Sequence, residues 1–152
     1  MNWIIHKSKK MPSHTYLSEV LKPLNDHIED YNWVLSDIDG GNLDGLPIDY
    51  DHDYFVLSPI EFKKILNSRF QFYWGSILAI PLHITIKIDE DNPPYVEGNN
   101  LIWKNGNIQY SGAEIEIDCV DSGYTIVKFS REDLSNKFKT YFDEAIDLED
   151  FK

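Results

Sequence analysis

The sequence predicts an α+β fold: an antiparallel meander sheet of about six strands with two or three helices packed on one face. Three observations lead to this prediction. Strand-like runs separated by short turns fill the second half of the chain, which is typical of successive hairpins. Apolar residues recur at helical spacing near both ends of the chain. A well-specified helix start, Ser58-Pro59-Ile60-Glu61, lies between two strand-like runs in the middle. Helices set apart from hairpins favour the α+β class.

Length and composition indicate one domain, residues 1–152, with enough apolar sequence for a core of its own. Hydrophobic residues make up 42% of the chain, which argues against a disordered protein. The formal net charge is −12 and the isoelectric point is near 4.6. Such a protein repels phosphate backbones, so the composition predicts no binding to nucleic acid and favours a basic protein partner.

The cysteine count and the apolar runs bear on the compartment. Cys119 is the only cysteine, so no internal disulfide forms, and a reducing compartment fits best. The apolar run in Met1 to Lys7 is too short for the hydrophobic region of a secretory signal, and it predicts a first strand. The longest uninterrupted apolar run, Ile77 to Ile80, is far shorter than a membrane span. We therefore expect a cytoplasmic protein with no membrane partner.

The first helix is predicted from a stripe of apolar residues between Leu17 and Ile28. Ser13 or Thr15 can cap its start. Pro23 lies inside the stripe, and an interior proline removes a backbone donor and crowds the preceding turn. The helix should therefore kink at Pro23 or end near Lys22.

Strands and one further helix account for most of the remaining chain. Alternation and β-branched composition predict strands, while Asn105-Gly106 and Asp121-Ser122-Gly123 predict hairpin turns. A last helix should begin at Ser130, where Asp133 would complete a capping box. The predicted strands are Tyr31–Ser36, Tyr54–Leu57, Gln71–Ile80, Leu82–Ile88, Leu101–Lys104 with Ile108–Tyr110, Ala113–Cys119 and Tyr124–Phe129.

The segment from Asp37 to Asp53 is the candidate functional region. Its glycines, its proline and its six aspartates predict a loop, and it is longer than a simple connection requires. Alternation in an extended segment would place Asp49, Asp51 and Asp53 on one side. Tyrosines beside charged groups are common at the centres of protein interfaces. The predicted partner-binding residues are Asp37, Asp39, Asp44, Asp49, Tyr50, Asp51, Asp53 and Tyr54.

An enzymatic alternative rests on Val34-Leu35-Ser36-Asp37-Ile38-Asp39-Gly40-Gly41, which resembles the first motif of haloacid-dehalogenase-type phosphatases. The resemblance implies magnesium-dependent phosphoryl transfer, with Asp37 as nucleophile and Asp39 as acid and base. Gly41 stands where that family has threonine. The predicted hairpins also cannot build that family's parallel sheet.

Two further readings of the same loop remain open. Oxygen ligands from Asp37, Asp39, Asn42 and Asp44 could bind calcium, although their spacing departs from the EF-hand loop. A divalent ion could also be bound by Asp49, Asp51, His52 and Asp53. The loop could also be a plain solvated acidic segment. The preferred interpretation assigns no catalytic residue, no metal and no cofactor.

Three stretches together resemble small bacterial immunity proteins of polymorphic toxin and contact-dependent inhibition systems: Trp33–Asp37, Phe55–Phe62 and Phe70–Gly75. The resemblance implies an acidic, single-domain cytoplasmic protein that neutralises a cognate toxin domain, often a basic nuclease, by covering its active site. Under this interpretation the aspartates occupy the toxin's lysines and arginines, and the two tyrosines anchor the contact. A structural adaptor protein is the other non-enzymatic alternative.

Overall fold

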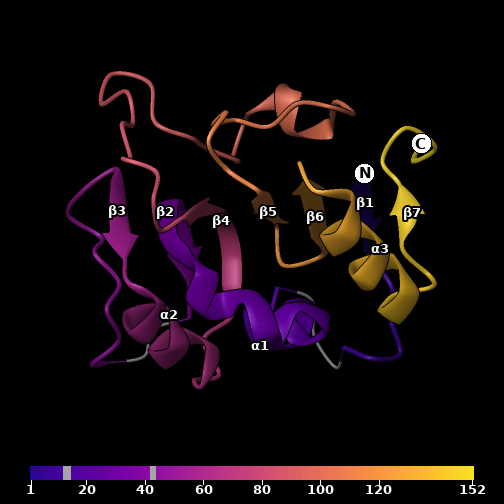
Figure 1. Ribbon diagram of the computed structural model, residues 1–152, viewed down its shortest axis with the longest axis horizontal. Helices are drawn as coiled ribbons and strands as arrows, with labels where there is room; N and C mark the ends of the chain where they lie inside the picture. Colours follow the sequence, from indigo (N-terminus) through magenta and orange to yellow (C-terminus); the bar gives the residue numbers. More distant parts are fainter. Residues whose placement is uncertain (12–14, 42–43) are drawn as a thin grey trace.

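A single antiparallel sheet organises the molecule (Figure 1). The computed structural model describes residues 1–11, 15–41 and 44–152. Seven strands lie in the order β3-β2-β4-β5-β6-β1-β7, and every neighbouring pair is antiparallel. The sheet is open, and the α+β prediction is confirmed with one strand more than expected. The strands are β1 (Asn2–Ile5), β2 (Tyr31–Gly40), β3 (Tyr54–Leu57), β4 (Phe72–Pro81), β5 (Ile115–Val120), β6 (Tyr124–Phe129) and β7 (Ile146–Asp147).

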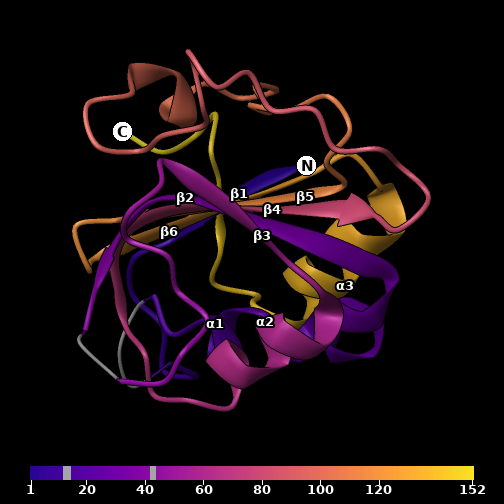
Figure 2. The ribbon, with the colours of Figure 1, turned by 90° about the vertical axis from the view of Figure 1, so that its left-hand side faces the viewer.

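The principal helices cover one face of this sheet, and a long irregular segment covers the other (Figure 2). Residues 82–114 form that segment, which we call the cover; it includes the short 3₁₀ helix η2 (Asn100–Trp103). Strands β4, β5 and β6 form a meander, and β1 adds to β6. On the helix face lie α1 (Leu17–Val20), the 3₁₀ helix η1 (Lys22–Asp30), α2 (Pro59–Leu66) and α3 (Glu132–Tyr141).

The start of α2 confirms the predicted capping box. The Ser58 hydroxyl oxygen accepts from the Glu61 backbone N–H at 3.3 Å, and the Glu61 carboxylate accepts from the Ser58 N–H at 3.0 Å. Pro59 occupies the first turn, where its missing N–H has no intrahelical partner to lose. The backbone of Glu61 and its neighbours is therefore satisfied where the chain leaves β3.

The first helical region divides as Pro23 predicts. The α-helical turn ends at Val20, and the chain continues as a 3₁₀ helix with the proline at its start. The predicted cap Ser13 lies outside the described residues. Thr15 has a φ of 69°, and the N-cap position belongs to Tyr16, which makes no side-chain cap.

The last helix begins later than predicted. Arg131 holds the N-cap position without a side-chain cap, so the predicted box from Ser130 is wrong. Arg131 instead forms a two-bond ion pair with Asp133, with its shorter distance at 2.6 Å. The helix ends at Tyr141, which frees the following residues to form β7 against β1.

The cover replaces two predicted strand regions. No ladder forms at 82–88, and 101–110 holds η2 instead of a hairpin. The alternation in 82–88 has another cause: Ile84, Ile86 and Ile88 pack against an apolar cluster around Val34 and Leu78 on the sheet. Alternation of apolar and polar residues indicates that every second side chain is buried. A segment that lies across the face of a sheet can have this pattern without hydrogen bonding to a strand.

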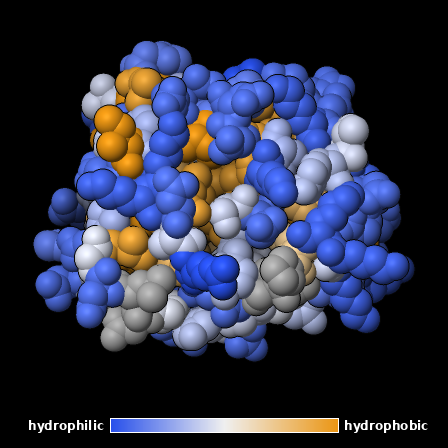
Figure 3. Space-filling model, turned by 90° about the horizontal axis from the view of Figure 1, so that it is seen from below, coloured by the Kyte–Doolittle hydropathy of each residue, from blue (hydrophilic) through white to orange (hydrophobic). Residues whose placement is uncertain are grey.

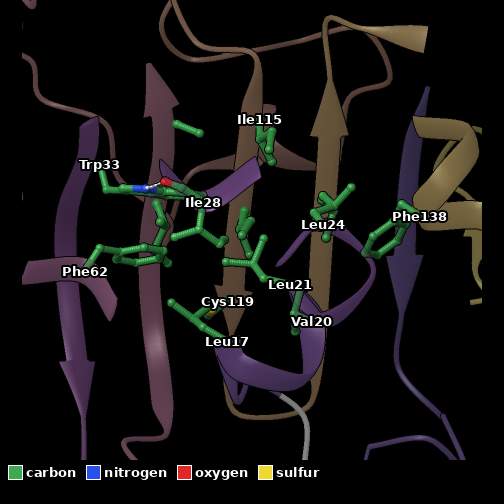
Figure 4. Close-up of a cluster of buried hydrophobic side chains, with 14 of the residues drawn as sticks. Leu17, Val20, Leu21, Leu24, Ile28, Trp33, Phe62, Ile115, Cys119 and Phe138 are labelled. Carbon is green, nitrogen blue, oxygen red and sulfur yellow. Dashed lines mark hydrogen bonds between the residues drawn. The ribbon is translucent and has the colours of Figure 1, made fainter. Parts of the chain in front are cut away.

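Trp33 lies at one side of the helix-side core, beside Phe62 and Ile28 (Figure 4). Its ring stacks on Phe62 of α2 with centroids 4.0 Å apart, and its indole N–H donates to the Ile28 carbonyl oxygen at 3.2 Å. One buried tryptophan therefore joins β2 to both α2 and η1. Outside this core the helix face is mostly hydrophilic, with hydrophobic residues showing near its middle (Figure 3).

A buried polar seam lies under the cover. Lys128, Glu116 and Asp118 are each fully buried, with the ammonium nitrogen 3.4 Å from the Glu116 carboxylate and 3.8 Å from that of Asp118. Gln109 of the cover donates its backbone N–H to Glu116 at 2.6 Å, and Lys128 donates to the Asn107 carbonyl at 2.7 Å. The seam ties the middle of the cover to β5 and β6, between two apolar clusters.

Candidate functional site

The candidate loop begins later than the sequence predicts, because β2 extends to Gly40. Asp37 and Asp39 lie on the irregular end of this strand, where the register against β4 shifts twice. Gly40 permits this path: a Cβ there would approach the Gln71 carbonyl oxygen and the Phe70 ring to 2.5 Å. Asp37 and Asp39 are therefore fixed by the sheet and are not part of a free loop.

A cavity of about 260 Å³ opens where this strand end meets the cover and the β2–β3 connection. Four predicted residues line it: Asp37, Asp49, Tyr50 and Asp53. The other lining residues are Ser36, Ile38, His52, Phe55, Pro93, Pro94 and Tyr95. We call this set of residues the acidic cavity.

Asp37 forms the junction between the sheet and the cover. Its backbone is left-handed, with a φ of 54°. One of its carboxylate oxygens accepts two backbone N–H groups of the cover, from Val96 at 2.8 Å and Glu97 at 2.9 Å. Hydrogen bonds to an ionised acceptor are the strong ones. Asp37 therefore holds the wall of the cavity in place.

Asp49 and His52 make the outer rim. The Asp49 carboxylate accepts the Asp51 backbone N–H at 2.9 Å and lies 2.7 Å from the His52 ring nitrogen Nδ1. These two contacts, the backbone bond first, lower the pKa of Asp49 below its ordinary value. The lowered pKa keeps the Asp49 carboxylate ionised. Its bond to the Asp51 N–H also stabilises the turn on which it lies.

The remaining predicted residues do not all converge on the cavity. Asp39 lies near Tyr50, whose pKa is raised first by partial burial and then by that carboxylate. Asp44 and Asp51 are exposed and do not line the cavity. Tyr54 is half-buried against the apolar cluster beneath the cover, so its ring has a packing role. Half of the predicted set therefore lines the cavity, and Asp39, Asp44, Asp51 and Tyr54 do not.

Sequence reasoning missed the wall formed by Pro93, Pro94 and Tyr95. The sequence places the two prolines at the end of a predicted strand, whereas their approach to the cavity depends on how the cover folds back over β2. The double proline signals an irregular segment but not its destination. Tyr95 is 42% exposed and adds an aromatic ring to the cavity that Asp49 and Asp53 also line.

The acidic cavity and the segments around it, which we call the acidic corner, carry mainly negative charge. Residues 31–62 contain no lysine or arginine, and the cover adds Asp89, Glu90 and Asp91 just before the proline wall. Carboxylates with low local positive charge attract cations and repel phosphates. The corner is therefore suited to ammonium or guanidinium groups.

The geometry does not favour the phosphatase alternative. The Asp37 oxygen that two amides hold is committed to the cover, and the sheet is antiparallel throughout. Among residues 1–11, 15–41 and 44–152, no three His, Cys, Asp or Glu side chains are grouped to hold a metal ion. Asn42, one of the predicted calcium ligands, lies outside the described residues.

Replacing Asp37 with asparagine is expected to lower the free energy of unfolding by about 1 kcal/mol, because the amides of Val96 and Glu97 lose their charged acceptor. Chemical denaturation measures the loss, and hydrogen exchange should speed up at these two amides. Asp39→Asn is the matched control, since Asp39 is exposed, and it should change stability by less than about 0.5 kcal/mol. Unchanged exchange at both amides would contradict the structural role of Asp37.

In the described part of the chain no helix is long and apolar enough to cross a membrane. The chain was also compared with known proteins. It matches no protein-family model, no curated protein and no solved structure.

Proposed function

We propose that this protein is an immunity protein: it binds a basic toxin domain and neutralises it by covering the toxin's active site. The observation that carries the proposal is the acidic cavity, in which carboxylates and tyrosines converge and whose lining contains no lysine or arginine. The resemblance of three stretches to small bacterial immunity proteins supplies the biological role.

The size of the cavity indicates what enters it. At about 260 Å³ it lies below the range of about 300–1,000 Å³ that holds most small-molecule ligands. One lysine or arginine side chain of a protein partner is a suitable occupant, with Asp49 and Asp53 as its charged contacts and Tyr50 or Tyr95 beside its aliphatic part.

The surrounding carboxylates supply long-range attraction. Asp51 and Asp53 are exposed, so their contribution is chiefly to the association rate and to the choice of partner. A nuclease that binds phosphates with lysines and arginines presents the complementary field. The bound protein then excludes the nucleic acid by steric overlap and by like-charge repulsion, and no covalent chemistry is required.

The double variant Asp51→Asn/Asp53→Asn is expected to bind the toxin domain about tenfold more weakly, since it loses Asp53, which lines the acidic cavity, and the exposed Asp51 two residues before it. Affinity capture from the native host, together with the gene next to that of this chain, identifies the toxin domain. Titration calorimetry then measures the dissociation constant, which should rise as salt is added.

Asp26→Asn/Asp150→Asn is the matched control, because it removes the same charge from exposed residues on η1 and after β7. It should bind within about twofold of the wild type, since its carboxylates lie outside the acidic cavity. Equal losses in the two double variants would reduce the effect to net charge, and an unchanged affinity in the rim variant would place the interface elsewhere.

A further inference from the structure

The outer edge of β3 carries backbone groups that point away from the sheet. Leu82 donates its N–H to the Asp30 carbonyl across the end of the β2–β4 ladder. This bond makes Tyr31 and Pro81 a non-hydrogen-bonded pair, because an antiparallel ladder places its bonds between the flanking residues there. Hydrogen-bonded and non-hydrogen-bonded pairs alternate along the regular part of β2. The N–H and C=O groups of Trp33 and Leu35 therefore point toward β3.

The same alternation fixes β3. Leu57 and Phe55 lie opposite Trp33 and Leu35 and exchange hydrogen bonds with them. The N–H and C=O groups of Tyr54 and Val56 therefore face outward. Within the described part of the chain, no backbone hydrogen bond from outside the sheet reaches these four groups.

Of the features that usually prevent pairing at a sheet edge, this edge has only its shortness, since β3 is four residues long. Edge strands are ordinarily protected by lysine, proline, a bulge or an inward-pointing charge. Tyr54-Phe55-Val56-Leu57 has none of these, and β3 pairs with β2 in regular register. Figure 2 looks onto this edge. By contrast, β7 at the other edge is only two residues long.

Exposed apolar side chains accompany the free backbone groups. Val56 is 44% exposed, and Ile60, in the first turn of α2, is 74% exposed, the highest value among the large hydrophobic residues described. Phe55 lines the acidic cavity, so the β3 edge with the exposed side chain of Val56 forms a short apolar strip beside that cavity. An added strand would cover this strip and satisfy the outward peptide groups.

Charge selects the occupant. A second copy of this chain would bring two acidic corners and two net charges of −12 together, which is unfavourable. A strand with lysine or arginine beside apolar residues matches both the strip and the carboxylates of Asp49 and Asp53.

We infer that the β3 edge is a docking site for an extended segment of a basic protein, which adds a strand antiparallel or parallel to Tyr54–Leu57 and places a cationic side chain in the acidic cavity. This inference rests on the proposed function for the identity of the partner, the toxin domain. It adds the mode of binding, since main-chain hydrogen bonds to Tyr54 and Val56 supply affinity in addition to charge.

Hydrogen exchange with a model strand tests the docking mode independently of the toxin. The probe is a short peptide that alternates lysine and valine. In the free protein, the amides of Tyr54 and Val56 should exchange faster than those of Phe55 and Leu57. With the peptide present at saturation, exchange at Tyr54 and Val56 should slow by at least about tenfold. The charge control is a peptide that alternates glutamate and valine, which should leave both amides unchanged.

Val56→Pro removes an outward N–H while leaving the bonds between β3 and β2, since proline is tolerated where an edge N–H faces solvent. It should weaken peptide binding by at least about tenfold, whereas Val56→Thr, which keeps the N–H, should weaken it less than about threefold. Retained protection at Phe55 and Leu57 shows that the proline variant is folded. Val56→Lys, which places a cation on the edge, should also reduce binding.

Three results of the exchange and peptide-binding measurements would overturn the docking mode. The first is that the peptide protects other amides but not those of Tyr54 and Val56. The second is that Val56→Pro and Val56→Lys both bind the peptide as well as the wild type does. The third is that the protection of these amides increases with protein concentration in the absence of peptide, which indicates self-pairing. Toxin inhibition that survives in the folded Val56→Pro variant would also overturn it, while leaving the immunity function intact. Loss of inhibition in Asp51→Asn/Asp53→Asn would support the cationic contact in the acidic cavity, which the docking mode shares with the proposed function.

Discussion

Replacing Lys128 with methionine is expected to lower the free energy of unfolding by about 3–5 kcal/mol. The ammonium group is fully buried and, among the described residues, is the only cation paired with Glu116 and Asp118, at 3.4 and 3.8 Å. Methionine fills similar volume but leaves a buried carboxylate without its counter-ion. It also removes the donor to the Asn107 carbonyl, so the cover loses one of its attachments.

Urea denaturation of the wild type and the variant measures this loss. The matched control is the double variant Glu116→Gln/Lys128→Met, in which both charges of the closer pair are absent and the introduced amide oxygen can still accept the Gln109 N–H. The double variant should recover at least about 2 kcal/mol, because removing both partners avoids a buried uncompensated charge. If the two variants were equally stable, the ion pair would not be the source of the effect.

The fold was predictable where the chain's signals are local. The capping box at Ser58, the break at Pro23 and the turn at Asp121-Ser122-Gly123 each act within a few residues, and the structure has all three. The predicted cap at Ser130 failed for an equally local reason, because Arg131 forms an ion pair with Asp133 and the chain enters the helix one residue later.

The cover was not predictable in the same way. Ile84, Ile86 and Ile88 alternate as a half-buried strand does, but their burial comes from lying on the sheet face. What holds the cover is a set of contacts distant in sequence, such as Asp37 to Val96 and Gln109 to Glu116. A pattern of hydrophobicity identifies buried positions and carries no information on which surface buries them.

The candidate site also has one part that local sequence signals predict and another that depends on contacts distant in sequence. The density of aspartates between Asp37 and Asp53 was sufficient to locate the acidic corner, and the structure brings Asp37, Asp49 and Asp53 to one cavity. Its opposite wall at Pro93–Tyr95 depends on the path of the cover. The role of Asp37 as an anchor also depends on two amides far along the chain, which no local motif signals.

Replacing Asp118 with asparagine is expected to raise the free energy of unfolding at pH 7 by about 2 kcal/mol. Burial first, and the neighbouring Glu116 carboxylate second, raise the pKa of Asp118 well above its ordinary value of 3.8. Lys128 lies closer to Glu116, which also accepts the Gln109 N–H, so Glu116 is the better-satisfied carboxylate of the two. One oxygen of Asp118, Oδ2, has no hydrogen-bond partner among the described residues.

The sign of the pH dependence follows from these contacts. The folded protein keeps a proton on Asp118 at pH values where the unfolded chain has released it, so the folded state binds more protons and this group's contribution to stability falls as pH rises. That contribution is fully present below about pH 3.8 and is lost as the pH rises toward the folded-state pKa. Asparagine cannot ionise, so its stability curve should be flatter between about pH 4 and 7.

The measurement is the free energy of unfolding of both proteins across this pH range. The two curves should converge toward pH 4 and separate toward pH 7, with the variant above the wild type. Asp147→Asn, a half-buried aspartate on β7 outside the seam, is the control and should leave the pH dependence unchanged. A variant that is less stable than the wild type at pH 7 would mean that Asp118 is ionised in the folded state and that Lys128 neutralises both carboxylates. The seam would then be a charged triad that holds the cover by attraction, and not an ion pair beside a neutral acid.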